Sequence, residues 1–324
     1  MNTVSRTFAH LCLLIPATLT AQSQSAPERT LNVPAALGAN AIWSRGYLFH
    51  LASDDGAIGV YSTAGDVYQV AAQTRIALDG GKVLNYQDAA AGPSGTVFAA
   101  TGSGLSADGG RTGLIAFFGP ESKAPVIVQL PGTAVFRIVF ADDGTLWALV
   151  RQYDSAFQEL PEYNLLRHYD SNGKLLGAAV PRSSFKKTLD DRKVPMYIPS
   201  LTASHDTIGL YLDKVETWME LAYDGSMKGQ WQVPKVQVGE GQNLKFSRIY
   251  LTTSNQLVRM SPVGAKKPTN LVDDLQKSGT NLVATPLNWG SLAPFHPYFL
   301  GVEGEDQVVS LENSNTLHWS KLQH

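Results

Sequence analysis

A repeat with a 49-residue spacing is the feature of this sequence that most constrains its fold. Three segments carry a glycine that is followed, three positions later, by an aromatic residue, and 49 residues separate each from the next: Gly46–Phe49, Gly95–Phe98 and Gly144–Trp147. A longer insertion displaces the next copy to Asp206, and further copies begin at Asn255 and Asp306. Six copies of this length predict a fold assembled from similar supersecondary units.

A second element recurs out of phase with the first. It is a β-type run containing an aromatic residue, and these aromatics are 56, 52 and 54 residues apart: Tyr61, Phe117, Tyr169 and Tyr223. Each run meets a glycine-containing turn and then another β-type run, which indicates a hairpin. With no long helical periodicity, each unit contains four strands. The sequence therefore predicts an all-β, six-bladed β-propeller with four antiparallel strands per blade. An irregular β-sandwich with chance turn spacing is the alternative.

The two ends of the chain complement each other. The sixth unit contains only three candidate strands, at residues 298–302, 307–311 and 316–320. At the other end, residues 29–34 resemble the segments that close earlier units, 178–181 and 231–234. We therefore expect the N-terminal strand to complete the last blade, which would close the ring and remove two free sheet edges. Residues 29–324 would then form a single domain.

The first 21 residues have the order of a secretory signal peptide. Arg6 precedes a short apolar core, and small residues lead to Ala21, after which we expect cleavage. The apolar run is too short to span a bilayer, and an apolar N-terminal helix of the fold is the alternative. Residues 22–28 form a short polar leader. The sequence thus predicts an exported protein, periplasmic or extracellular, without a membrane span.

Composition excludes several kinds of site and partner. The only cysteine, Cys12, lies in the expected signal peptide, so the remaining 303 residues contain neither a disulfide nor a cysteine zinc site. Without Arg6 the chain has 25 basic and 28 acidic residues, a net charge of −3. This charge is unlike that of a basic nucleic-acid binder. We expect a monomer that binds no nucleic acid.

Three charged residues fall at one level of the predicted channel. The first strand of each blade lines the channel, and the positions seven residues before the repeat starts are Ala39, Asp88, Arg137, Pro199, Arg248 and Phe299. Two arginines and one aspartate near the axis predict a site for a carboxylate or another small anion, because a guanidinium pairs planar anions through two hydrogen bonds. In the alternative, Asp88 only neutralises one arginine across a water-filled channel.

The long connections are predicted to share one face of the ring. Loops 102–112 and 151–162 join second and third strands, and loops 182–196 and 235–244 join one blade to the next. The short glycine turns near residues 65, 173 and 225 lie on the opposite face. Loops on a rigid scaffold commonly carry binding sites. Tolerated surface variation is the alternative interpretation of these loops.

Two six-residue segments share one pattern, Pro93–Phe98 and Asp142–Trp147. Each begins with Asp or Pro, has Gly at its third position, and ends with an apolar residue followed by an aromatic one. In this pattern the chain resembles the six-bladed propellers of the NHL-repeat and gluconolactonase-like type. The resemblance implies a fold for nearly the whole mature chain, and it implies that a lactonase would hold a divalent metal in the channel with carboxylates and amides. Asn85 and Asp88 match part of such a set, but we expect no glutamate on the inner strands to join them.

No catalytic residue can be assigned from the sequence. A Gly-x-Ser-x-Gly elbow is absent, and the histidines have no ligand spacing. The leading hypothesis is a non-catalytic exported propeller without a cofactor, which binds a partner protein or a small anionic ligand on its loop face through Asp88, Arg137 and Arg248. A lactonase-type hydrolase that uses calcium or another divalent metal is the first alternative. A structural envelope component is the second.

Overall fold

The structure is a computed structural model that describes residues 28–34, 41–52, 56–76, 85–105, 109–120, 124–185, 200–244, 246–264, 269–289 and 298–323. The expected signal peptide and residues 22–27 of the leader lie outside the described residues. The channel positions Ala39 and Pro199 also lie outside them.

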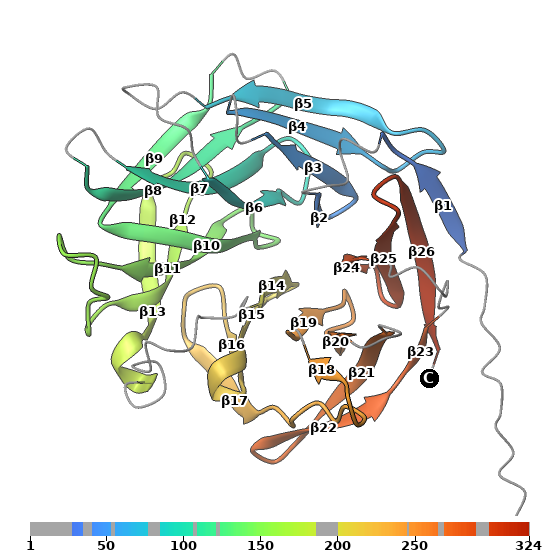
Figure 1. The fold of residues 1–324 in the computed structure, drawn as a ribbon. Coiled ribbons are helices and arrows are strands. Elements are labelled where there is room, and N and C mark those ends of the chain that lie inside the picture. Colours follow the sequence, from blue (N-terminus) through green and yellow to red (C-terminus); the bar gives the residue numbers. More distant parts are fainter. Residues whose placement is uncertain are drawn as a thin grey trace, which may run out of the picture.

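The described chain is all-β and has a β-propeller arrangement, with sheets placed around a common axis (Figure 1). Three sheets contain four antiparallel strands each, which follow one another in chain order from the axis outward. The strands are β2 (Ile42–Ser44), β3 (Tyr47–Leu51), β4 (Ala57–Ser62) and β5 (Gln69–Arg75); β6 (Asn85–Ala91), β7 (Phe98–Leu105), β8 (Arg111–Phe118) and β9 (Val126–Pro131); and β10 (Thr133–Phe140), β11 (Leu146–Gln152), β12 (Asn164–Tyr169) and β13 (Leu175–Pro181).

Two larger sheets complete the arrangement. A nine-stranded sheet contains β14 (Ser200–Ser204), β15 (Thr207–Leu212), β16 (Thr217–Leu221), β17 (Met227–Gln232), β18 (Asn243–Leu244), β19 (Arg248–Leu251), β20 (Leu257–Gly264), β21 (Thr269–Ser278) and β22 (Asn281–Pro286). A five-stranded sheet contains β1 (Arg29–Asn32), β23 (Asn288–Trp289), β24 (Tyr298–Glu303), β25 (Gln307–Glu312) and β26 (Thr316–Gln323).

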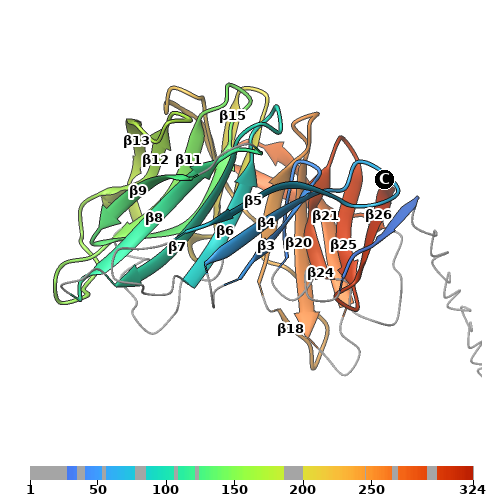
Figure 2. The same cartoon turned by 90° about the horizontal axis from the view of Figure 1, so that it is seen from above.

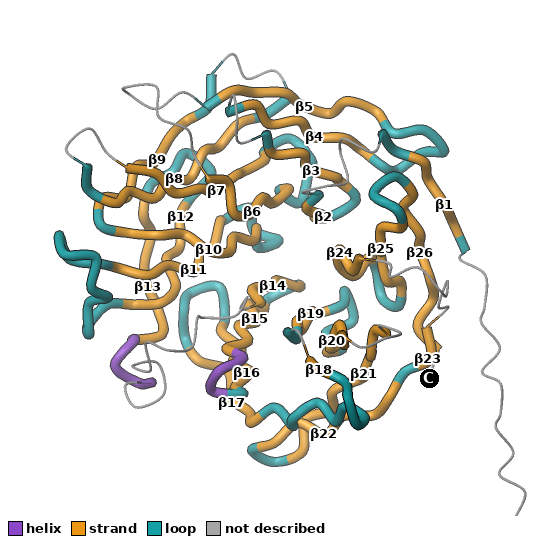
Figure 3. Tube along the Cα trace, viewed as in Figure 1, coloured by secondary structure: helices purple, strands orange, loops and turns teal. Residues whose placement is uncertain are grey.

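Helical structure in the described chain is limited to two short 3-10 segments, η1 (Arg182–Phe185) and η2 (Asp213–Val215), which are the purple segments of Figure 3. Neither has the length or the apolar character that a membrane-crossing helix needs.

The N-terminal strand β1 pairs with the last strand, β26. The antiparallel register places Arg29 opposite Trp319 and Asn32 opposite Thr316. Leu31 is 3% exposed and belongs to a core cluster that also contains Leu317 and Trp319. The expected pairing of the two ends is therefore present, and Figure 1 shows β1 at the outer edge of its sheet.

The hydrophobic core is divided into clusters that lie between neighbouring sheets. One cluster joins β3 to β7 through Phe49 and Phe98, whose ring centres are 6.0 Å apart. The next joins β8 to β10 through Phe117 and Phe140, at 6.4 Å. Because side chains of a strand alternate between its two faces, each sheet contributes to two such clusters. Viewed from the side, the sheets stand next to one another with twisted strands (Figure 2).

The outer hairpins follow the predicted turn chemistry. In the turn between β12 and β13, Asp170 Oδ1 accepts hydrogen bonds of 2.9 Å from the amides of both Asn172 and Lys174. Gly173 has a φ of 81°, a left-handed conformation that glycine adopts without steric cost. The prediction that this segment is a hairpin turn is confirmed.

The prediction of a loop over residues 102–112 is wrong at both of its ends. Strand β7 continues to Leu105 and β8 begins at Arg111, and these two residues are paired. Gly102 makes this extension possible, because a Cβ atom there would come within 2.9 Å of the Asn85 carbonyl oxygen on β6. Gly102 therefore allows β6 and β7 to come close together, and it is not part of a flexible loop.

Candidate functional site

A cavity of about 520 Å³ lies along the axis of the ring. It is lined by residues of β2, β6, β10, β14, β19 and β24, the innermost strands in Figure 1. Each of these strands contributes residues to the lining, among them Ser44, Asp88, Arg137, Thr202, Arg248 and Tyr298. The cavity is therefore the channel of the propeller, and its walls combine polar and apolar surface.

Asp88 and Arg137 come together in this cavity. Arg137 Nη1 lies 3.7 Å from Asp88 Oδ1, and Asp88 Oδ2 accepts a hydrogen bond of 2.9 Å from the amide of Ile138. Both residues directly follow a β-bulge, since the register shifts at Gln87 on β6 and at Phe136 on β10. A bulge bends its strand and redirects the adjacent side chains. Equivalent bulges on two inner strands thus position the two charged groups.

Arg248 is the first residue of β19 and lines the same cavity. Its guanidinium carbon lies 5.3 Å from the ring centre of Phe246. Its Nε atom is buried and has no hydrogen-bond acceptor among the described residues. Phe299 also lines the cavity, but it is 7% exposed and packs with Val258 and Val272 in the core. The three residues predicted to bind a ligand therefore share one site.

Burial perturbs the pKa of each charged group in this site. It raises the pKa of Asp88, although Arg137, the amide of Ile138 and Arg248 each act in the opposite direction. Burial also lowers the pKa of Arg137. Burial lowers the pKa of Arg248 while Tyr250 raises it, and the net shift of Arg248 is upward. Two guanidinium groups and one carboxyl group have thus lost much of their water, which is costly unless polar partners replace it.

The other end of the cavity is crossed by polar contacts. Arg45 Nη2 lies 2.6 Å from Asp142 Oδ1 and donates a 3.0 Å hydrogen bond to the Phe140 carbonyl oxygen. The amide of Asp142 donates to the hydroxyl of Tyr223 at 3.1 Å. Arg45 comes one position after the end of β2, and Asp142 comes two positions after the end of β10. The three predicted ligand-binding residues instead lie within the inner strands, before the last residue of each strand. The two ends of the cavity therefore differ in chemistry.

Sequence reasoning missed three further lining residues near the charged group. Gln87 lines the cavity at the bulge of β6, Tyr250 lies on β19, and Tyr298 begins β24. The position of Gln87 depends on the bulge, for which the sequence carries no visible signal. Tyr298 is one position before Phe299. It is 65% exposed, whereas an aromatic residue in a strand is expected to be buried. His205 lines the cavity from a turn, with a φ of 47°.

The expectation that the inner strands carry no glutamate is wrong. Glu303 ends β24 and lines the cavity. Its carboxylate accepts a hydrogen bond from the indole of Trp319, and it belongs to the end of the cavity away from Asp88. Asn85 is exposed at the start of β6. Across the described ranges, no three His, Cys, Asp or Glu side chains gather where they could hold a metal ion.

Comparison with known proteins identifies a fold but no family. No family model matches the chain, and no curated protein matches it. Among solved structures, a member of the DUF4221 family from Bacteroides vulgatus has a TM-score of 0.54 at 8% identity, over 92% of this chain and 98% of that one. A Bacteroides fragilis protein named as an exported protein has a TM-score of 0.50 at 11% identity, over 91% and 95% of the two chains. A streptogramin B lyase has a TM-score of 0.41 at 10% identity, over 91% and 97%.

At these identities the similarity concerns the fold alone, since one fold hosts many functions. The DUF4221 structure shares its fold with 92% of this chain. The comparisons do not single out the NHL-repeat or gluconolactonase-like group.

Proposed function

We propose that this protein is an exported, six-bladed β-propeller whose central cavity binds a small anionic ligand through Arg137 and Arg248. The observation that carries the proposal is that two largely buried guanidinium groups lie with the carboxylate of Asp88 in one part of the cavity, whose other carboxylates, Asp142 and Glu303, lie toward the far end. In this proposal the protein is a binding protein that acts without a cofactor.

A count of six blades is supported by a weak connection within the nine-stranded sheet, which joins two groups of strands. Strands β17 and β22 are connected by one parallel pair, Gln232 with Asn281, whereas the other neighbouring long strands pair over several residues. Division at this pair leaves one sheet of β14–β17 and another of β18–β22. Together with the four other sheets, this division agrees with the six copies of the repeat, and β1 supplies the outer strand of the last blade.

The long contact of Asp88 with Arg137 and the unpartnered Nε of Arg248 support anion binding over simple neutralisation by Asp88. The contact between Asp88 and Arg137 is long, at 3.7 Å, and the other oxygen of Asp88 is held by the amide of Ile138. The Arg248 Nε has no acceptor in the described part of the chain. An anion placed between the two guanidinium groups would give the Arg248 Nε the acceptor that it lacks among the described residues, through a charge-assisted hydrogen bond.

Export and a single mature domain belong to the same proposal. They are supported by the signal-peptide order of residues 1–21 and by the pairing of β1 with β26, which uses the first residues after the leader. In this proposal the mature chain is a monomer.

Anion-dependent thermal stabilisation tests the binding site. The unfolding temperature of the mature protein should rise with the concentration of at least one of acetate, benzoate, sulfate and gluconate. At 100 times its Kd, a ligand adds about 2.7 kcal/mol to the free energy of unfolding. The double variant Arg137→Gln/Arg248→Gln should fold and lose this effect.

The control is Arg111→Gln, since Arg111 lies outside the cavity with its guanidinium carbon 4.8 Å from the ring centre of Tyr153. This variant should respond to anions as the wild type does. Equal stabilisation of the double variant would refute the proposed site. A reproducible rise with calcium that exceeds every anion effect would instead favour a metal-dependent hydrolase of the lactonase type.

A further inference from the structure

The charge of the site limits the charge of its ligand. Arg137 and Arg248 supply two positive charges, and Asp88 removes one of them at 3.7 Å from Arg137. A dianion such as phosphate would meet only one net positive charge and would also approach the carboxylate of Asp88. A monoanion matches the net charge, and charge balance matters most where water is excluded.

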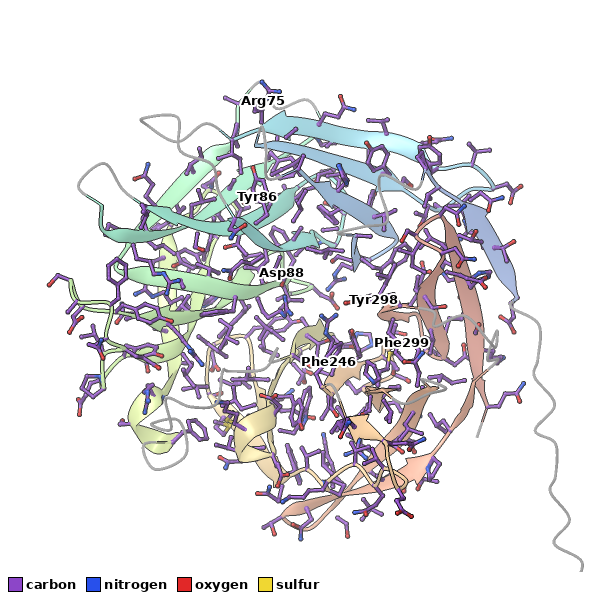
Figure 4. All side chains as sticks on the ribbon, in the orientation of Figure 1. Arg75, Tyr86, Asp88, Phe246, Tyr298 and Phe299 are labelled. Carbon is purple, nitrogen blue, oxygen red and sulfur yellow. The ribbon has the colours of Figure 1, made fainter. Side chains whose placement is uncertain are left out.

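Aromatic side chains border the charged group. Tyr250 and Tyr298 both line the cavity and both act electrostatically on Arg248. Tyr298 is 65% exposed, although it begins a strand next to the core. In Figure 4, Tyr298 and Phe246 lie with Asp88 around the centre of the ring. An exposed ring at the rim of a cavity offers a face on which a flat ligand can stack.

Gln87 places a free acceptor beside Arg137. Its Nε2 donates a 3.2 Å hydrogen bond to Ser103 Oγ, and its main-chain oxygen accepts from Arg137 Nη1 at 3.4 Å. Its side-chain oxygen is buried and receives no hydrogen bond from the described residues. A buried acceptor without a donor is unfavourable, so an O–H or N–H group of a ligand at this position would be stabilised.

We propose, on the basis of the function proposed above, that the ligand is an aromatic monocarboxylate with a hydroxyl or amino group near its carboxylate. The carboxylate lies between Arg137 and Arg248, the ring stacks on Tyr298, and the donor group bonds to the side-chain oxygen of Gln87. An inorganic anion or a polyhydroxylated acid would make no use of the exposed ring of Tyr298.

Calorimetric titration of the mature protein tests this assignment, with benzoate, the three hydroxybenzoates, acetate, gluconate and phosphate as probes. Benzoate should bind at least tenfold more tightly than acetate, gluconate or phosphate, and at least one hydroxybenzoate should bind more tightly than benzoate. Gln87→Leu should abolish the difference between that hydroxybenzoate and benzoate. Unchanged discrimination by this variant would overturn the role of Gln87.

Two further variants test the ring and the charge. Tyr298→Ala should weaken benzoate binding about fivefold to tenfold and leave acetate binding unchanged. Phe157→Ala, which removes a half-exposed ring outside the cavity, should change neither. Asp88→Asn adds one net positive charge and should make phosphate binding measurable. An Asp88→Asn protein that still rejects phosphate would overturn the charge argument.

The outcomes separate this inference from the function on which it rests. If acetate, gluconate or phosphate binds as tightly as benzoate and depends on both arginines, the ligand class is wrong and anion binding stands. If benzoate binds equally well to Arg137→Gln/Arg248→Gln, or if no anion binds to the wild type, both proposals fail.

Discussion

At the residue scale, the repeat register located the charged site. Asp88 and Arg137 occupy equivalent positions because 49 residues separate them and both follow a bulge on an inner strand. Arg248 reaches the same cavity from the first position of β19. The sequence could not predict Gln87 or Tyr298, whose positions depend on local backbone irregularity and on exposure at the rim. Glu303 was missed because β24 extends one residue beyond the expected strand.

Asp213 provides a test of burial at a single residue. It begins η2, and burial raises its pKa to about 6 from an ordinary value of 3.8, although Lys214 and Arg151 act against this shift. The folded state therefore binds this proton more tightly than the unfolded state, and stability falls as the pH rises from about 4 to about 6. Asp213→Asn should raise the free energy of unfolding at pH 7.5 by about 1–3 kcal/mol.

Urea unfolding at two pH values measures this effect. At pH 3.5 the aspartate is mostly protonated in both states, so the variant and the wild type should differ little there. A loss of stability at pH 7.5, or the same gain at both pH values, would show that burial of the charge is not the cause.

At the element scale, the sequence predicted hairpins more reliably than the connections between them. The turn at Asp170 follows local hydrogen-bonding rules, so it could be recognised without knowledge of the rest of the fold. The extension of β7 and β8 over residues 102–105 and 111–112 depends on contact with β6, which no local pattern reports. Contacts between strands far apart in the sequence could not be predicted either, for example the 2.7 Å ion pair of Lys277 on β21 with Glu220 on β16.

The closing strand β1 makes a prediction at this scale. Leu31 is 3% exposed between β26 and the neighbouring core, so Leu31→Ala should reduce the free energy of unfolding by about 2–4 kcal/mol. Thr30→Ala is the matched control, because Thr30 is exposed on the other face of the same strand and should cost no more than about 0.5 kcal/mol. Chemical denaturation measures both changes. Equal effects of the two variants would mean that the side chain of Leu31 on β1 does not contribute to the hydrophobic core.

At the scale of the whole molecule, the repeat predicted the β-propeller arrangement and the pairing of its two ends. Pairing of β1 with β26 joins the first and last described parts of the ring, and the described residues contain no cysteine that could join them instead. The same arrangement creates the axial cavity, because each inner strand turns one edge toward the axis. The ligand could not be predicted at this scale, because the β-propeller arrangement does not determine which side chains line the channel.

A crystal structure of the mature protein grown in sodium bromide tests the central claim most directly, because bromide is a small monoanion whose position is identified by anomalous scattering. We predict a bromide ion inside the axial cavity, in contact with the guanidinium groups of both Arg137 and Arg248. Bromide ions found only at surface arginines, with none between these two residues, would contradict the proposed anion site.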